Sequence, residues 1–243
     1  MSERNEHRKE VQNRITAVIG RKGSGKSTML AERLKRADRV LVFDPMSEHS
    51  GKKGWLPNQV QTLQELENFM RWNRKRGEWG AGYVPDEDLE GEVEAVARAL
   101  YERANLTFGI EEVPLLCSPS YLPPMLGKLI RTGRHRQIDI FWTAQRASEV
   151  SRTLTSLTDE FILFSQTEPR DLDAIAARCG NEVARKVAEL GRHDFMTWDV
   201  GARRLTEHGN NPEKAAERDA RRAERASAGR RLRIVGGVRR IHI

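Results

Sequence analysis

Short apolar runs alternate along the chain with stretches in which apolar residues recur every three or four positions. The short runs are rich in β-branched and aromatic residues, which is typical of buried strands. They lie at residues 15–19, 40–43, 106–110, 138–142, 161–164 and 193–199. The periodic stretches predict helices. They lie at residues 28–37, 63–76, 93–101, 124–131 and 170–190, the last as two helices that meet at Cys179-Gly180.

The alternation of strands and helices predicts an α/β fold. Its sheet should be mostly parallel, with helices on both faces. In such sheets, ligand-binding loops lie at the carboxyl edge. Residues 46–61 and 85–92 are expected to be loops, and Gly77, Gly80 and Gly82 are expected to interrupt the chain after residue 76.

Charge divides the chain unevenly. The net charge of the 243 residues is +7, and residues 201–243 alone hold 12 Lys and Arg against 5 Asp and Glu. We therefore expect a polar arm at residues 1–13, a neutral domain at 14–200 and a basic tail at 201–243. A basic tail favours a polyanion or an acidic neighbour as partner, with a solvated extension as the alternative. A helix after Asn211-Pro212 and a hairpin around Gly236-Gly237 are expected within it.

The remaining composition places limits on function. Two cysteines, Cys117 and Cys179, provide neither a disulfide framework nor metal-ligand spacing. The charged N-terminus lacks the apolar region of a secretory signal. No apolar window approaches the roughly 18 residues of a membrane span. We therefore expect a cytoplasmic protein without a transmembrane segment.

One motif carries specific chemistry. Residues 20–27 read GRKGSGKS, the pattern G-x-x-x-x-G-K-[ST] between a predicted strand and a predicted helix. Glycines in such a loop let backbone N–H groups face phosphate oxygens, the lysine reaches the β- and γ-phosphates, and the serine hydroxyl binds Mg²⁺. This predicts a site for ATP and Mg²⁺. Its nucleotide-binding residues would be Gly20, Gly23, Ser24, Gly25, Lys26, Ser27 and Thr28.

An acidic pair ends the predicted strand at 106–110. Glu111 would contribute to the magnesium site with Ser27, and Glu112 would polarise the attacking water. Asp44 competes for this role because it also ends an apolar strand. The adjacent glutamates are favoured because two carboxylates fit the two roles.

Together with the loop and the acidic pair, the run Ile138–Arg146 (IDIFWTAQR) resembles the FtsK/HerA superfamily of DNA-pumping ATPases. The resemblance covers roughly residues 14–200 and implies a RecA-like P-loop NTPase fold. That superfamily usually has Asp-Glu where this chain has Glu111-Glu112. The resemblance implies that Gln145 senses the γ-phosphate. It also implies a homo-oligomeric ring, commonly a hexamer, in which a neighbour's arginine completes each site. Arg131, Arg134 and Arg136 are candidates, and Arg134 is favoured.

Within that superfamily, the compact length is most like a viral genome-packaging ATPase. This implies double-stranded DNA as partner, a capsid or membrane-associated protein as a further one, and the host cytoplasm or the virion as location. DNA phosphates would be contacted by basic side chains near Trp72 and Trp79 and in the loop after the second strand. The candidates are Lys52, Lys53, Arg74, Lys75 and Arg76.

Two other classes of function fit the phosphate loop. One is a nucleotide switch or assembly factor that does not move DNA, and the other is a small-molecule kinase. The Gln145-Arg146 signature favours the DNA translocase. The chain has no Asn-Lys-x-Asp motif, which argues against a GTPase.

Overall fold

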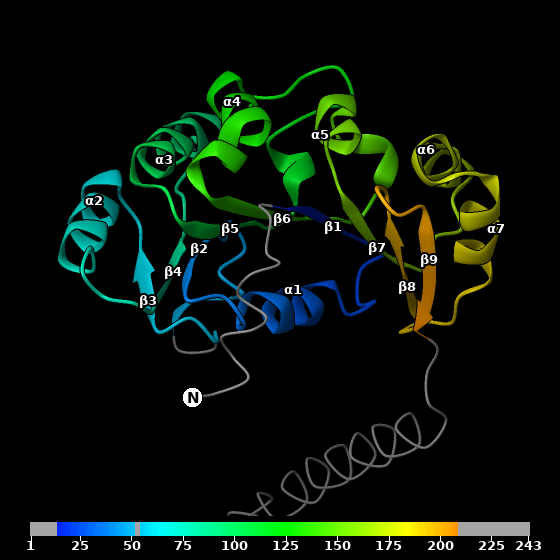
Figure 1. Ribbon diagram of the computed structural model, residues 1–243, viewed down its shortest axis with the longest axis horizontal. Coiled ribbons are helices and arrows are strands. Elements are labelled where there is room, and N and C mark those ends of the chain that lie inside the picture. The colour runs from blue at the N-terminus through cyan, green and yellow to red at the C-terminus, as the bar shows by residue number, and fades with distance from the viewer. Residues whose placement is uncertain (1–13, 52–53, 209–243) are drawn as a thin grey trace, which may run out of the picture. The chain divides into compact units, whose positions relative to one another are not determined.

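The computed structural model describes residues 14–51 and 54–208, which form strands and helices in alternation (Figure 1). The strands are β1 (Ile15–Ile19), β2 (Arg39–Phe43), β3 (Asn58–Val60), β4 (Trp79–Tyr83), β5 (Leu106–Ile110), β6 (Ile138–Ala144), β7 (Glu160–Phe164), β8 (Phe195–Asp199) and β9 (Arg204–His208). The α-helices are α1 (Lys26–Leu34), α2 (Leu63–Trp72), α3 (Leu89–Arg103), α4 (Pro124–Thr132), α5 (Arg152–Ser156), α6 (Pro169–Cys179) and α7 (Asn181–Glu189).

All nine strands belong to one sheet, in the order β3-β4-β2-β5-β6-β1-β7-β8-β9. In this order, all neighbouring strands from β3 through to β7 pair in parallel, and β8 pairs antiparallel with β7. The predicted mostly parallel sheet is therefore confirmed. β1 lies between β6 and β7, so the loop that follows it opens at the middle of the carboxyl edge.

The two faces of the sheet are covered unequally. Alternate residues of β2 point to opposite faces, as strand geometry requires. Leu41 and Phe43 enter the larger core beneath α2 to α7, whereas Val40 and Val42 pack with Leu30 and Leu34 of α1. Figure 1 shows α2 to α5 over one face and α1 beneath the other. The predicted helices on both faces are therefore confirmed, and in the described chain a single α-helix covers the second face.

Local capping explains where two helices begin. Thr62 precedes α2, and its hydroxyl accepts a hydrogen bond from the Glu65 backbone at 3.2 Å. The Glu65 carboxylate accepts in return from the Gln61 backbone at 2.8 Å, an exchange close to a capping box. Asp88 caps α3 through the Gly91 backbone at 2.9 Å. This cap lies within the segment predicted as an acidic loop.

Three strands are absent from the prediction: β3, β4 and β9. The glycines of β4 were interpreted as breaks, but they serve packing. A Cβ at Gly82 would lie 2.4 Å from the Cβ of Ser50, and one at Gly80 would lie 3.0 Å from Leu56. The missing side chains let Ser50 and Leu56 approach β4 closely. Short, polar β3 and β9 carry no apolar run that could have revealed them.

Strand β9 lies beyond residue 200, where the sequence predicted the tail to begin. The N-terminal arm, Lys52, Lys53, the helix after Asn211-Pro212 and the hairpin around Gly236-Gly237 fall outside the described residues. In the described part of the chain, no helix has the length and apolar character needed to span a membrane.

Candidate nucleotide-binding site

The predicted phosphate loop connects β1 to α1. Gly23 and Gly25 have φ values of 75° and 108°, a region that favours glycine. The first hydrogen bond of α1 runs from the Met29 backbone to the Gly25 carbonyl at 2.9 Å. N–H groups before that bond have no partner within the helix and can face an anion.

Gly20 is required by close packing. A Cβ at Gly20 would lie 2.5 Å from the Cβ of Phe164 and 2.6 Å from the hydroxyl of Ser24. The Gly20 N–H donates to the Ala144 carbonyl at 3.1 Å. The start of the phosphate loop is therefore held between the ends of β6 and β7.

Lys26 lies at the centre of the site. Its side chain is buried and donates to the Arg21 carbonyl at 3.3 Å. Burial lowers the pKa of Lys26, and the charges of Glu112, Glu111 and Glu48 act in the opposite direction. Burial is the larger effect, so the pKa of Lys26 lies below its ordinary value, and the three carboxylates offset part of the cost of burying the charge.

Ser27 is next to two of these acids. Its Oγ lies 2.9 Å from Glu111 Oε1 and 3.1 Å from Glu48 Oε2. Hydroxyl and carboxylate oxygens are the ligands that Mg²⁺ prefers. Ser27 and Glu111, both predicted for the metal, therefore fit a magnesium ion beside the phosphate loop, with Glu48 as a further oxygen donor. Thr28 follows in the first turn of α1 with an exposed side chain.

Glu112 and Gln145 end neighbouring strands and contact each other. Glu112 has φ 51° and ψ 59°, a sparsely populated conformation for a side-chain-bearing residue. Its backbone donates to Thr143 Oγ1 at 2.9 Å, and its carboxylate accepts from the Gln145 backbone at 3.1 Å. Gln166 fixes the same turn by donating to the Gln145 carbonyl at 2.8 Å. The Gln145 side chain itself is exposed.

Asp44, the acid that competed for the magnesium role, has a structural role instead. Its carboxylate accepts from the backbones of Glu48, His49 and Ser50 and from the Ser50 hydroxyl, at 2.9 to 3.1 Å. It therefore folds the turn after β2. This turn brings Glu48 and His49 to the phosphate loop, and His49 lies 2.9 Å from Glu111. Sequence reasoning missed both residues, because only Asp44 followed a recognisable strand.

Two contacts act on the His49 ring. Burial alone would lower the pKa of His49, but the hydrogen bond and charge of Glu111 outweigh it and raise that pKa. The Trp55 indole N–H, 3.0 Å from Nδ1, opposes a second ring proton because an indole can only donate. The neutral ring with its proton on Nε2 satisfies both contacts.

The loop before β8 also contacts the phosphate loop. His193, between α7 and β8, lies with its Nδ1 3.3 Å from the Ser24 carbonyl. The guanidinium of Arg192 would be 3.6 Å from a Cβ at Gly23. Neither residue had a motif that could have identified it.

The other predicted residues lie elsewhere. Arg134 precedes β6, and Arg74, Lys75 and Arg76 precede β4. They therefore lie at the amino edge of the sheet, opposite the phosphate loop. Arg146, beside Gln145, is bound to α6: its Nε lies 3.3 Å from the buried Asp171 carboxylate.

Comparison with known proteins supports the architecture. No family model and no curated protein sequence matches the chain. Among solved structures, it is similar to the genome packaging NTPase B204 from Sulfolobus turreted icosahedral virus 2 in complex with AMPPCP. The identity is 21%, the TM-score is 0.66, and the match covers 81% of this chain and 97% of that one. The chain has a P-loop NTPase fold.

Two further matches to solved structures support the same fold. The same viral NTPase in complex with ATP-gammaS has a TM-score of 0.66 at 19% identity, covering 82% of this chain and 98% of that one. VirB4 of Thermoanaerobacter pseudethanolicus has a TM-score of 0.52 at 12% identity, covering 80% and 88%. The fold implied by the resemblance to the FtsK/HerA superfamily is thus confirmed.

Proposed function

We propose that this chain is an ATP-hydrolysing motor that moves double-stranded DNA, of the kind that packages viral genomes. The observation that carries the proposal is the meeting of the phosphate loop, the acidic pair and Gln145 at one edge of the sheet. The likeness to a packaging NTPase over 97% of that chain's length supports the same reading. Such a motor would act in the host cytoplasm or the virion, beside a capsid or membrane-associated partner.

In the proposed hydrolysis, each site residue has a distinct task. The phosphate loop and Lys26 bind the phosphates, and Ser27 and Glu111 would hold Mg²⁺. The ion, when bound, would neutralise charge on the β- and γ-phosphates. Glu112 accepts the proton of the attacking water. Gln145 contacts Glu112 through its backbone and can report the γ-phosphate through its amide.

Contact with DNA is proposed for the amino edge. Trp72 is 76% exposed, so its indole is available to a partner rather than part of the core. Arg74, Lys75 and Arg76 follow it with exposed side chains. A cavity of about 410 Å³ opens at the same edge, lined by Arg39, Met70, Arg74, Trp79, Glu102, Arg103, Ala104 and Leu106. The guanidinium groups of Arg39, Arg74 and Arg103 at this cavity could bind DNA phosphates whatever the base sequence.

DNA-dependent hydrolysis tests the proposal. ATP turnover should rise strongly with double-stranded DNA, and the rise should weaken from low to moderate salt because phosphate contacts release counterions. Glu112→Gln should lower turnover roughly 10²–10⁴-fold while still binding ATP. Glu189→Gln, an exposed change on α7, is the matched control. Hydrolysis indifferent to DNA would favour a nucleotide switch or a kinase.

A further inference from the structure

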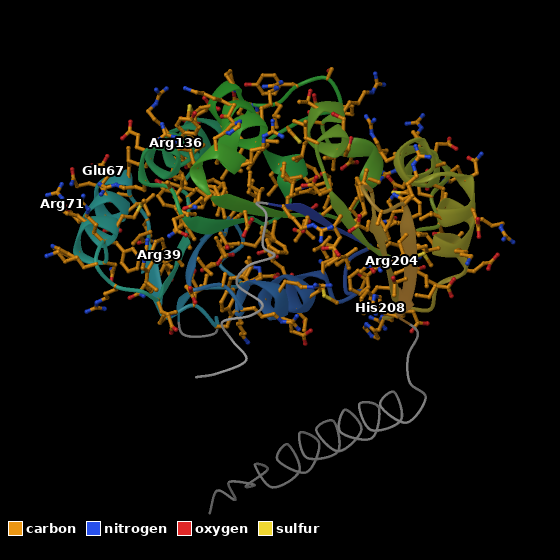
Figure 2. All side chains as sticks on the ribbon, in the orientation of Figure 1. Arg39, Glu67, Arg71, Arg136, Arg204 and His208 are labelled. Carbon is orange, nitrogen blue, oxygen red and sulfur yellow. The ribbon has the colours of Figure 1, made fainter. Side chains whose placement is uncertain are left out.

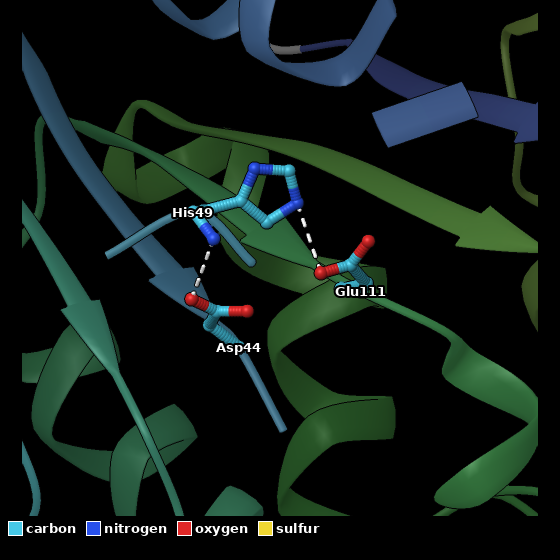
Figure 3. Close-up of side chains that lie close together, drawn as sticks. All are labelled: Asp44, His49 and Glu111. Atoms are coloured by element: carbon cyan, nitrogen blue, oxygen red, sulfur yellow. Dashed lines mark hydrogen bonds and ion pairs between the residues drawn. The ribbon is translucent and has the colours of Figure 1, made fainter. Parts of the chain in front are cut away.

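Asp44, His49 and Glu111 meet beside the phosphate loop (Figure 3). Asp44 directly follows β2, His49 lies in the turn after it, and Glu111 directly follows β5. All three are buried, and one ligand atom from each lies within 4.8 Å of the others. A cluster of this composition raises the question of a second metal ion.

The hydrogen bonds of the cluster favour another role. Asp44 already accepts four hydrogen bonds from the turn that it folds. His49 has both ring nitrogens engaged, Nδ1 by the Trp55 indole at 3.0 Å and Nε2 by Glu111 Oε2 at 2.9 Å. A metal ion would have to break these contacts. The cluster is a chain of contacts that runs from Trp55 through the His49 ring to Glu111.

The direction of that chain follows from Trp55. Its indole N–H can only donate, so His49 Nδ1 is the acceptor and the ring proton is on Nε2. Figure 3 shows the imidazole directed at the Glu111 carboxylate. The Trp55 ring packs edge-on against His49, with centroids 6.4 Å apart. Trp55 therefore fixes both the tautomer and the orientation of the imidazole.

Glu111 is consequently held at both oxygens. Oε2 lies 2.9 Å from His49 Nε2, as an ion-pair contact, while Oε1 lies 2.9 Å from Ser27 Oγ. A glutamate has one more rotatable bond than an aspartate, so its carboxylate needs an additional contact to stay in one place. Groups that hydrogen-bond to a metal-binding carboxylate orient it and change metal affinity.

We propose that His49 is a positioning residue that holds Glu111 so that its second oxygen faces the magnesium site at Ser27. The inference rests on the proposed function, because it requires Mg²⁺-dependent nucleotide binding. His49 touches neither nucleotide nor water in this scheme and acts through Glu111.

The test measures how much Mg²⁺ is needed for half-maximal binding of a fluorescent ATP analogue. His49→Leu, which removes the donor, should raise that concentration about 10-fold and leave analogue binding in EDTA unchanged. His49→Gln should restore most of the loss, because its amide can donate from nearly the same place. Trp55→Phe should give a smaller rise, since the tautomer is no longer fixed.

Ser50→Ala is the matched structural control. It removes one hydrogen bond to Asp44 but leaves the pair of His49 with Glu111. It should lower the melting temperature without moving the Mg²⁺ requirement. Equal effects of Ser50→Ala, His49→Gln and His49→Leu on that requirement would overturn the inference. So would a wild-type requirement in His49→Leu.

Two further outcomes separate the inference from the proposed function. A wild-type chain that binds no nucleotide would sink both. One that binds and hydrolyses ATP, with an Mg²⁺ requirement unchanged in the His49 variants, would sink only the inference. If His49→Leu does not fold, Trp55→Phe decides: an unchanged Mg²⁺ requirement in that folded variant would count against His49.

Discussion

The two edges of the sheet hold their polar residues in different ways. At the carboxyl edge, Lys26, Glu111 and His49 are buried and bonded to one another or to the backbone. At the amino edge, the charges of residues 74–76 are exposed. Figure 2 shows that the side chains of Arg71 and Glu67 on α2 also point away from the sheet.

This difference suggests that the carboxyl edge carries out hydrolysis and that the amino edge binds a partner. Buried charges are costly unless paired, so a buried cluster of this kind holds its geometry and tolerates few changes. Exposed charges cost little and contribute little to folding. Changes at the carboxyl edge should therefore alter hydrolysis, and changes at the amino edge should alter binding to a partner.

The largest expected effect concerns Arg134, because it lies at the amino edge but is predicted to act in a neighbour's active site. Arg134→Ala should lower DNA-stimulated turnover about 10³-fold if its guanidinium stabilises the transition state in trans. Arg98→Ala, an exposed change on α3, is the control.

Mixing subunits decides whether Arg134 acts in trans. Lys26→Met subunits lack their own site but retain Arg134. Added to Arg134→Ala subunits, they should restore part of the turnover. Unchanged turnover in Arg134→Ala would leave Arg134 without a part in the chemistry, and no recovery on mixing would show that it does not act in trans.

A pair of glycines gives a matched test of packing at the two edges. Gly20→Ala places a methyl group 2.5 Å from Phe164 Cβ, whereas a Cβ at Gly77 meets nothing within 4 Å. Gly20→Ala should destabilise the fold by about 1–3 kcal/mol and reduce hydrolysis. Gly77→Ala should change neither. Chemical denaturation and ATP turnover measure both, and equal stability of the two variants would contradict the close packing of the phosphate loop.

The smallest expected effect concerns DNA. Arg74→Ala with Lys75→Ala should reduce the slope of log affinity against log salt by up to roughly 0.9 per lost phosphate contact, with basal hydrolysis unchanged. The double variant Arg98→Ala with Arg185→Ala removes equal charge from exposed positions on α3 and α7. An identical loss in the control would show that net charge matters and the amino edge does not.

Motif and periodicity carried most of the prediction at the carboxyl edge. The phosphate loop, Glu111-Glu112 and Gln145 each follow an apolar run, and parallel strands end at one edge. The sequence could not reveal Glu48 and His49, because they lie in a polar turn, where apolar residues do not recur at the regular spacing of a helix or strand. Their positions depend on Asp44 folding the turn over Gly82.

The sequence by itself determined where the central strands lie along the chain and which residues form the phosphate loop, because buried strands and glycine-rich turns have strong local signals. Only the tertiary structure decided that Asp44 supports a turn while Glu111 faces Ser27. It also decided that His49 reaches Glu111 across 62 positions of the chain. Such contacts arise from strand order, and strand order depends on how the whole core packs.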